Sequence, residues 1–234
     1  MIHYHGGPIT PNVVAAKVWA GRHAFVSFSA PHQLEIAMEV CQSFAVDNGA
    51  FSSWKKGVSV DWGMYYKWVA SFARAANFDW AIIPDIIDGS EEENDALIDE
   101  WPLGDYGVPV WHMHESVERL QNLCRNWPRI CIGSSGEFSV VGNAKWRVRM
   151  DEAISSISDR RGFVKRKIHG LRMLNPKVFV DYPLSSADST NVARNIGIDM
   201  AWKGTNVPPT KEWRAQVLAA RIEQHNSLVK WSGK

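Results

Sequence analysis

Two aspartates stand where apolar, strand-like runs of this chain give way to small turn residues. Asp47 follows one such run and precedes Asn-Gly-Ala-Phe, and Asp188 lies within Ser-Ser-Ala-Asp-Ser-Thr-Asn. A carboxylate at a strand's end is held rigidly, so two of them could act as a nucleophile and an acid/base pair. Taken singly, each is better explained as a helix cap or turn residue. Their partnership depends on the elements that position them.

Those elements alternate between strand and helix along the chain. Eight short runs rich in Val, Ile, Phe and Trp predict strands, most of them ending in Gly, Ser, Asp or His. They cover residues 2–5, 24–29, 44–47, 80–84, 108–113, 129–133, 167–173 and 183–187. Helix starts between them are marked by Thr10-Pro11, Ala30-Pro31, Asp61, Ser90, Ser116, Asn143, Asn175-Pro176 and Ser189 or Thr190.

Eight strand–helix units in 234 residues predict an α/β fold, a compact (β/α)₈ barrel of the TIM type, built as a single domain over residues 1–234. A doubly wound open sheet is the alternative, but no Gly-x-Gly-x-x-Gly turn supports it. Residues 198–202 are a candidate ninth strand, and an amphipathic helix from about 210 to 228 would extend the barrel at its C-terminus.

Polar residues gather at the carboxyl ends of the predicted strands, which is the face where barrel enzymes form their active sites. They are His3, His5, Asp47, Asp85, His112, His114, Ser134–Glu137, His169, Arg172 and Asp188. This shared face favours a catalytic role for the two aspartates, because isolated turn residues need not coincide there. One carboxylate could attack the anomeric carbon of a sugar while the other moves a proton, as in retaining glycosyl transfer.

Two further features suit a planar ligand. The turn Gly133-Ser134-Ser135-Gly136 offers backbone N–H groups, and its small side chains permit close approach, although a plain strand-to-helix connection explains it equally well. Asp85 could accept hydrogen bonds from the N1 and exocyclic amino groups of a guanine-like edge, or could simply lead into a helix.

Composition sets limits on the function. A net charge of +1 neither indicates nor excludes nucleic acid. The cysteines Cys41, Cys124 and Cys131 lack Cys-x-x-Cys spacing and are interpreted as reduced core residues of a cytoplasmic protein. No apolar run approaches the length that spans a membrane, so we expect no membrane partner. We also expect no bound metal and no cofactor.

Together, these segments resemble the tRNA-guanine transglycosylase superfamily, and most closely its shorter branch, which inserts 7-deazaguanine bases into DNA. The similarity covers roughly residues 40–195. It implies that Asp188 is the nucleophile, that Asp47 assists proton transfer and that Phe51 stacks on the base. The residues implied to hold the base are Asp85, His114, Gly133, Ser134, Ser135, Gly136, His169 and Arg172.

The implied reaction is base exchange in a polynucleotide. A guanosine would be flipped into the barrel mouth, Asp188 would form a covalent glycosyl-enzyme, and a free 7-deazaguanine base would then displace it. The zinc site of the tRNA enzymes, with its clustered cysteines and histidine, has no counterpart in this sequence, which implies DNA rather than tRNA as the acceptor. Basic residues that could contact phosphates are Lys145, Arg147, Arg149, Arg160, Arg161, Lys165, Arg166 and Lys167.

Three other functions stay open at this point. The first is a metal-dependent hydrolase of the amidohydrolase type. Its ligand pattern resembles His3 and His5 on the first strand, a histidine on the fifth and Asp188 on the eighth. In this chain, however, the fourth strand does not end in the lysine of that pattern, and the sixth does not end in its histidine. A non-catalytic nucleic-acid-binding subunit is a second possibility, but it would have no need of both aspartates. A hydrolytic N-glycosidase would release the base without replacing it.

Overall fold

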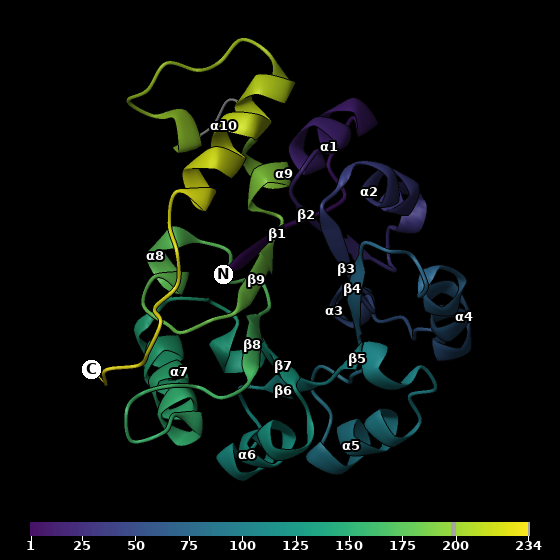
Figure 1. Ribbon diagram of the computed structural model, residues 1–234, viewed down its shortest axis with the longest axis vertical. Helices are drawn as coiled ribbons and strands as arrows, with labels where there is room; N and C mark the ends of the chain where they lie inside the picture. Colours follow the sequence, from purple (N-terminus) through teal and green to yellow (C-terminus); the bar gives the residue numbers. More distant parts are fainter. Residues whose placement is uncertain (198–199, 234) are drawn as a thin grey trace.

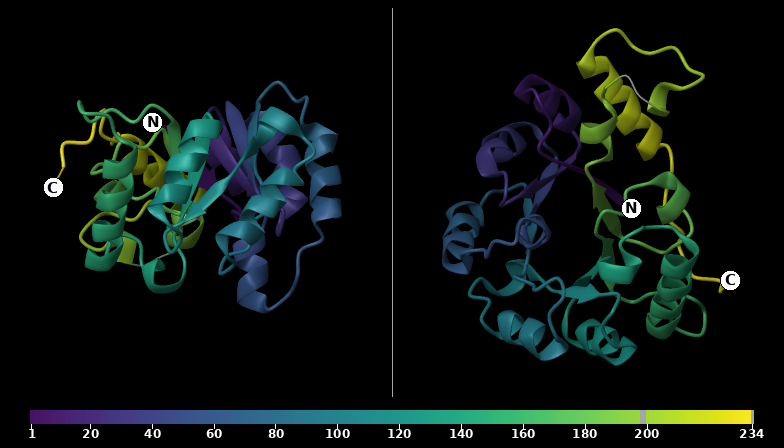
Figure 2. Two further views of the ribbon diagram at one scale, coloured as in Figure 1. Left: turned by 90° about the horizontal axis from the view of Figure 1, so that it is seen from below. Right: turned by 180° about the vertical axis from the view of Figure 1, so that it is seen from behind.

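Figure 1 shows a ring of strands enclosed by helices in the computed structural model, which describes residues 1–197 and 200–233. The strands are β1 (Ile2–Gly6), β2 (His23–Ser27), β3 (Ser43–Asp47), β4 (Phe78–Ile82), β5 (Gly107–Val108), β6 (Val110–His112), β7 (Arg129–Gly133), β8 (Lys167–Gly170) and β9 (Ser186–Ser189). All pairings between these strands are parallel. Helices lie outside the strands from every side that Figure 2 presents.

The ring closes through a strand that a proline interrupts. The sheet order is β5-β4-β3-β2-β1-β9-β8-β7-β6, so β5 and β6 stand at its two ends, yet only Pro109 separates them along the chain. Proline has no N–H to donate to a neighbouring strand, while its carbonyl accepts from the N–H of Cys131 at 2.9 Å. Because β5 pairs with β4 and β6 with β7, the two segments act as one strand of an eight-stranded barrel. The predicted (β/α)₈ fold is confirmed.

Helices connect successive strands around the outside. They are α1 (Asn12–Trp19), α2 (Leu34–Val40), α3 (Ala50–Lys56), α4 (Trp62–Phe72), α5 (Glu91–Asp99), α6 (Val117–Asn126), α7 (Ala144–Ile157), α8 (Pro176–Phe179), α9 (Asn191–Asn195) and α10 (Lys211–Glu223). Single 3₁₀ turns are η1 (Pro31–Gln33), η2 (Gly104–Tyr106), η3 (Gly136–Phe138) and η4 (Met200–Trp202). The predicted caps Asp61, Ser90, Ser116 and Asn143 are confirmed, since each side chain accepts the N–H three residues further on.

Two elements differ from the sequence-based expectation. The candidate ninth strand is wrong for residues 200–202, which form η4, and residues 198–199 lie outside the described residues. Helix α3 has no counterpart among the predicted helix starts. Gly49 has φ 82°, and a Cβ there would lie 3.1 Å from the backbone nitrogen of Ser29. Glycine therefore lets the chain turn sharply from β3 into α3.

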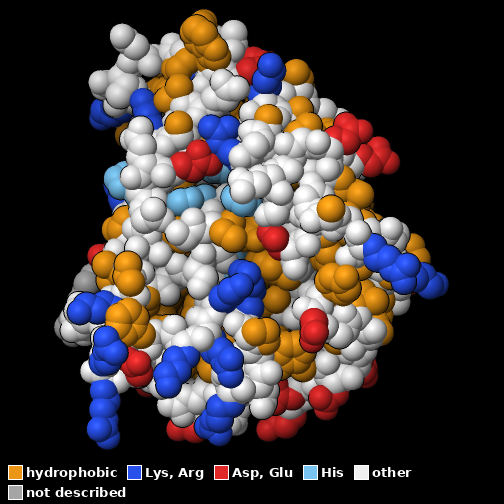
Figure 3. Space-filling view, in the orientation of Figure 1, with side chains coloured by type: hydrophobic (Ala, Val, Ile, Leu, Met, Phe, Trp, Pro, Cys, Tyr) orange, Lys and Arg blue, Asp and Glu red, His pale blue; other side chains and the backbone are white. Residues whose placement is uncertain are grey.

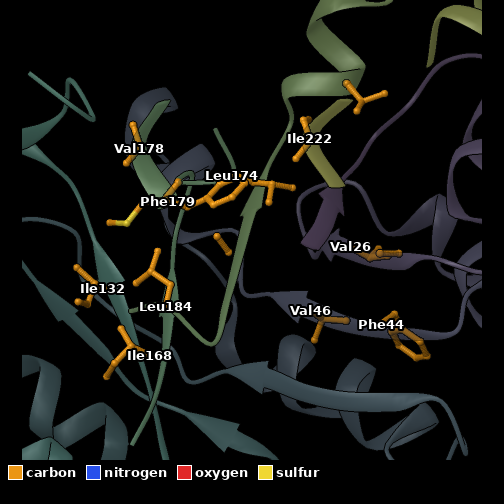
Figure 4. Packing of buried hydrophobic residues seen from close by; sticks show 14 of the residues in the cluster. Val26, Phe44, Val46, Ile132, Ile168, Leu174, Val178, Phe179, Leu184 and Ile222 are labelled. Atoms are coloured by element: carbon orange, nitrogen blue, oxygen red, sulfur yellow. The ribbon is translucent and has the colours of Figure 1, made fainter. Parts of the chain in front are cut away.

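Aromatic rings fill the middle of the barrel. Tyr4, Phe25 and Trp80 form its interior with smaller residues, and the ring of Trp80 lies 4.8 Å from that of His169. A larger apolar layer joins the outer faces of the strands to the helices, and Figure 4 shows part of it, with Ile132 and Ile168 beside each other. These aromatic rings fill the barrel interior, and the side chains at the carboxyl ends of the strands line an open cavity above them.

The C-terminal part of the chain extends the barrel as predicted. Helix α10 packs against α1 and α9, and residues 224–233 then run past α8 and α7 (Figure 1). The ring of Trp231 stacks on that of Tyr182 at 5.7 Å, and the backbone N–H of Trp231 donates to the carbonyl of Gly162 at 2.7 Å. Among the described residues, no helix has both the length and the apolar character needed to cross a membrane.

Candidate active site

A cavity of about 610 Å³ lies at the carboxyl ends of the barrel strands. Its walls include most of the predicted site residues, namely Asp47, Phe51, Asp85, Gly133, Ser134, Ser135, Arg172 and Asp188. The two aspartates are thus neighbours in space although they are far apart in sequence. Three predicted site residues, His114, Gly136 and His169, lie off the cavity wall.

Asp188 is a buried side chain on β9 with one engaged oxygen. Its Oδ1 accepts the backbone N–H of Arg172 at 2.9 Å and lies 3.3 Å from Nε2 of His169, while no described residue donates to its Oδ2. A carboxylate can only accept, so the proton is assigned to Nε2 of His169. The Nδ1 atom of that ring lies 2.9 Å from the hydroxyl oxygen of Ser186. Asp188 therefore presents a fixed carboxylate with one oxygen free to react.

His169 supports the site from beneath instead of lining it. The imidazole is fully buried below Asp188, and burial lowers its pKa, although the carboxylate acts in the opposite direction. A neutral imidazole that bridges Ser186 and Asp188 holds the carboxylate in place. The expectation that His169 contacts the base is therefore corrected to a positioning role.

Asp47 lies in a different environment at the end of β3. Its Oδ2 accepts the hydroxyl of Ser27 at 2.6 Å and the N–H of Gly49 at 3.2 Å. Burial raises the pKa of Asp47 to about 6, and the nearby carboxylates of Asp188 and Asp85 act in the same direction. A carboxyl group with this pKa can give up a proton and take one back near neutral pH.

Asp85 is held from two sides on the floor of the cavity. Asn48 donates to its Oδ1 at 2.6 Å and to the carbonyl of Ile83 at 2.9 Å. Nε2 of His112 lies 3.0 Å from its Oδ2, in a contact that lacks hydrogen-bond alignment. Asn48 and His112 both line the cavity, and neither was predicted to bind a ligand.

His112 replaces His114 as the cavity histidine. Side chains alternate along β6, so Val110 and His112 face the barrel interior, whereas His114 lies beyond the strand, exposed, with its ring stacked 5.6 Å from that of His112. The alternation of inward- and outward-facing side chains along the strand is the sequence signal that could have identified His112. Both ring nitrogens of His112 are buried and without a hydrogen-bond partner among the described residues, so they could bind a polar ligand.

The turn after β7 offers backbone donors to the cavity. Ser134 and Ser135 are buried on its wall, and no described residue accepts from their backbone N–H groups. Trp146 Nε1 donates to the Ser134 hydroxyl at 2.8 Å, which fixes the turn. A Cβ at Gly133 would lie 3.0 Å from Nδ1 of His112, so glycine is needed for this packing. Gly136, by contrast, is exposed at φ 52° and only begins η3.

Arg172 lines the cavity and contacts the same turn. Its guanidinium lies 4.2 Å from the centre of the Phe51 ring and donates to the carbonyl of Ser134. With φ 60°, it is the one non-glycine residue of the described chain in the left-handed region, a strained conformation that aims its N–H at Asp188. Arg172 thus connects the cavity wall, the aromatic ring and the nucleophile candidate.

The rim and the floor of the cavity carry opposite charges. Lys55, Arg172 and Arg194 contribute the basic groups, and Asp47, Asp85 and Asp188 the acidic ones. Lys55 lies 5.3 Å from the centre of the Phe51 ring. A ligand that carries both anionic groups and hydrogen-bond donors is complementary to this arrangement.

The metal-ligand pattern of the amidohydrolase alternative does not form among the described residues. His3 and His5 point out of the barrel, where Nε2 of His3 contacts the carbonyl of His225 and Nε2 of His5 contacts Glu223, both at 2.9 Å. Within residues 1–197 and 200–233, no three His, Cys, Asp or Glu side chains are grouped to hold a metal ion. The amidohydrolase alternative therefore loses its first two ligands.

The basic stretch expected to contact phosphates is divided between two ends of the molecule. On α7, Lys145 pairs with Glu137, Arg147 with Asp181 and Arg149 with Glu152. Lys165–Lys167 lead into β8 at its amino end, opposite the cavity. Figure 3 shows Lys and Arg side chains gathered over α6 and α7 on one face. This stretch does not form one surface around the cavity.

The fold and the site together define an α/β barrel whose mouth holds three carboxylates, an aromatic ring and unpaired backbone donors. No model of a known protein family matches the chain, and no curated protein or solved structure matches it either. A functional assignment consequently rests on the chemistry of the cavity.

Proposed function

We propose that the protein is a base-exchange glycosyltransferase that replaces guanine in a polynucleotide with a 7-deazaguanine derivative. The main support is the contrast between its two mouth aspartates. One oxygen of Asp188 is fixed by two donors and the other has none among the described residues, while burial raises the pKa of Asp47 to about 6. One group suits nucleophilic attack and the other suits proton transfer.

In the first half of the reaction, Oδ2 of Asp188 attacks C1′ of the guanosine as the C1′–N9 bond breaks. The departing guanine takes the proton of the Asp47 carboxyl group, leaving an aspartyl ester and an Asp47 carboxylate. In the second half, Asp47 removes the N9 proton of the incoming 7-deazaguanine. The N9 nitrogen then attacks C1′ and releases Asp188, so both aspartates return to their starting forms.

The floor of the cavity suits recognition of a guanine-like base. The carboxylate of Asp85 can accept from the N1–H and amino groups of the base, and the unpaired N–H groups of Ser134 and Ser135 can donate to its carbonyl. His112 lines the same cavity, with its Nε2 3.0 Å from Oδ2 of Asp85. The ring of Phe51 can stack on the base once the Arg172 guanidinium moves off it.

The acceptor is a polynucleotide with a base flipped out of its stack, since the reacting carboxylates lie inside a cavity. DNA is the proposed acceptor, as the family resemblance implies, and the protein is proposed to work in the cytoplasm without a bound metal or cofactor. Basic groups at the rim suit the phosphates on either side of the flipped nucleotide.

Mass spectrometry of nucleosides tests this function. DNA and tRNA are compared from cells that express the chain or Asp188→Asn, with and without a supply of 7-deazaguanine bases. A 7-deazaguanine deoxynucleoside that needs both the base and Asp188 supports the proposal. Modified tRNA alone would change the acceptor, abasic DNA would indicate a hydrolytic N-glycosidase, and unmodified nucleic acid that binds the protein would indicate a non-catalytic subunit.

A further inference from the structure

Helix α3 carries an exposed surface that begins at the cavity. Phe51 and Lys55 line the cavity, and Trp54 and Lys56 lie beside them on the exposed outside of the helix. The indole of Trp54 is 43% exposed, and its centre lies 5.8 Å from that of Phe51 with 31° between the rings. Because these two residues are three apart on a helix, they share one face. The aromatic surface of the cavity therefore continues out into solvent.

The charged residues of α3 are both basic. Lys55 and Lys56 are exposed and form no ion pair with a described residue, and no Asp or Glu occurs between residues 49 and 60. Unneutralised lysines beside an exposed indole differ from the partnered basic residues of α7. Stacking rings flanked by cations are the means by which proteins hold unpaired nucleic-acid strands.

We propose that Trp54 stacks on the nucleobase adjacent to the one that enters the cavity, while Lys55 and Lys56 contact the flanking phosphates. This surface, formed by Trp54, Lys55 and Lys56, makes an unpaired strand the preferred acceptor. The inference rests on the proposed function, because the cavity supplies the place of the reacting nucleotide.

The preference for an unpaired strand follows from the geometry of stacking. In a duplex, each base is covered on both faces by its neighbours, so an indole reaches a base face only where the stack is open. Trp54 lies outside the cavity and cannot take the reacting base itself. Its partner is therefore a neighbouring base in a strand that is already single or locally opened.

Fluorescence anisotropy tests the surface with a labelled short DNA strand that contains one guanosine, offered single-stranded or as a duplex. Trp54→Ala should weaken single-strand binding roughly 5- to 100-fold, and Trp54→Phe should retain most of it. Trp213→Ala is the control, because Trp213 is 60% exposed on α10 and does not line the cavity. Lys55→Ala and Lys56→Ala should each reduce the slope of log Kd against log salt concentration by about 0.7.

Three results overturn the proposal: single-strand affinity unchanged in Trp54→Ala, an equal loss in Trp213→Ala, or a wild-type preference for the duplex. Base-exchange assays on the same variants separate the two claims. If base exchange persists and binding does not depend on Trp54, the proposed binding surface is rejected and the proposed enzymatic function is retained. If binding depends on Trp54 but the protein catalyses no base exchange, the binding surface is retained and the enzymatic function is rejected.

Discussion

Asp47 shows how burial can prepare one carboxyl group for two opposite proton transfers. Its pKa of about 6 lies well above the ordinary value of 3.8, so both forms are populated near neutral pH. The first half of the proposed reaction uses the protonated form and the second half uses the carboxylate. The two half-reactions should therefore respond to pH in opposite directions.

We predict that formation of the covalent intermediate slows as pH rises through about 6, whereas its reaction with the incoming base slows as pH falls through the same value. Asp47→Asn should slow both steps by about 10²- to 10⁴-fold and remove both pH dependences. Rapid-quench measurement of each half-reaction between about pH 5 and 8 provides the check. Parallel pH profiles for the two steps would contradict a shared acid/base group.

The exact residues of the site were harder to predict from sequence than its location. Asp47, Asp85 and Asp188 were identified because each follows a recognisable strand. His112 was passed over for His114, since the choice depends on where β6 ends and which of its side chains face inward. The burial of His169 and the left-handed backbone of Arg172 arise from tertiary packing and leave no local signal in the sequence.

At the scale of single elements, a buried ionic network holds the turn that follows β6. Glu115 accepts the backbone N–H of His112 at 2.9 Å and pairs with Arg119 at 2.6 Å, and both side chains are buried. Arg119 also donates to Val110 at 3.0 Å and pairs with Asp95 at 2.7 Å. The network therefore fixes the backbone on which His112 is presented to the cavity.

Arg119→Met is expected to lower the free energy of unfolding by about 3–5 kcal/mol, because it leaves the Glu115 carboxylate buried without its partner. Glu115→Gln in the same chain should recover part of that loss. Arg125→Met, on an exposed position of the same helix, is the matched control. Urea denaturation measures all three, and equal effects at positions 119 and 125 would reject the network as a source of stability.

The strands and caps were predictable because their signals are local. Strands of a parallel barrel are covered on both sides, so they occur as short apolar runs, and capping residues act within one helical turn. The split at Pro109, the helix after Gly49 and the 3₁₀ turn at 200–202 instead depend on which neighbours each segment meets. The predicted number of eight strands is nevertheless confirmed, because β5 and β6 together occupy the position of one strand in the barrel.

At the scale of the whole molecule, α10 is tied to the barrel by ionic contacts on the outside of β1. Glu223 lies 2.9 Å from Nε2 of the buried His5 and 2.9 Å from Nε of Arg22. Burial alone would raise the pKa of Glu223, but hydrogen bonds from His5 and Arg22 outweigh it and lower the pKa to about 2. A lowered carboxyl pKa stabilises the fold above its ordinary value of 4.5, and the benefit is lost as pH falls towards about 2.

Glu223→Gln is accordingly expected to reduce the free energy of unfolding by about 1–2 kcal/mol at pH 7, after allowance for solvent at this partly exposed contact. The difference from wild type should shrink as the pH falls below about 4. Glu39→Gln, at an exposed position of α2, is the control. Denaturation curves at several pH values give the comparison, and a deficit that stays constant with pH would rule out this ionic origin.

The barrel as a whole separates stabilising charge from reactive charge. Ionic contacts on its outer surface fasten helices, while three carboxylates line the cavity at its mouth together with the basic side chains of Lys55, Arg172 and Arg194. Like charges gathered in one cavity reduce stability, so they are expected where a reaction uses them. The proposed function depends most directly on one of these three carboxylates, Asp188, as the nucleophile.

Trapping the covalent intermediate is the most direct test. Wild-type protein, Asp188→Asn and the exposed-surface control Asp105→Asn are mixed with a guanosine-containing DNA strand, denatured, separated and mapped by peptide mass spectrometry. We predict a DNA adduct on the peptide that contains Asp188 in the wild type and the control, and none in Asp188→Asn. An adduct that persists in Asp188→Asn, or that maps to another residue, would contradict the proposed mechanism.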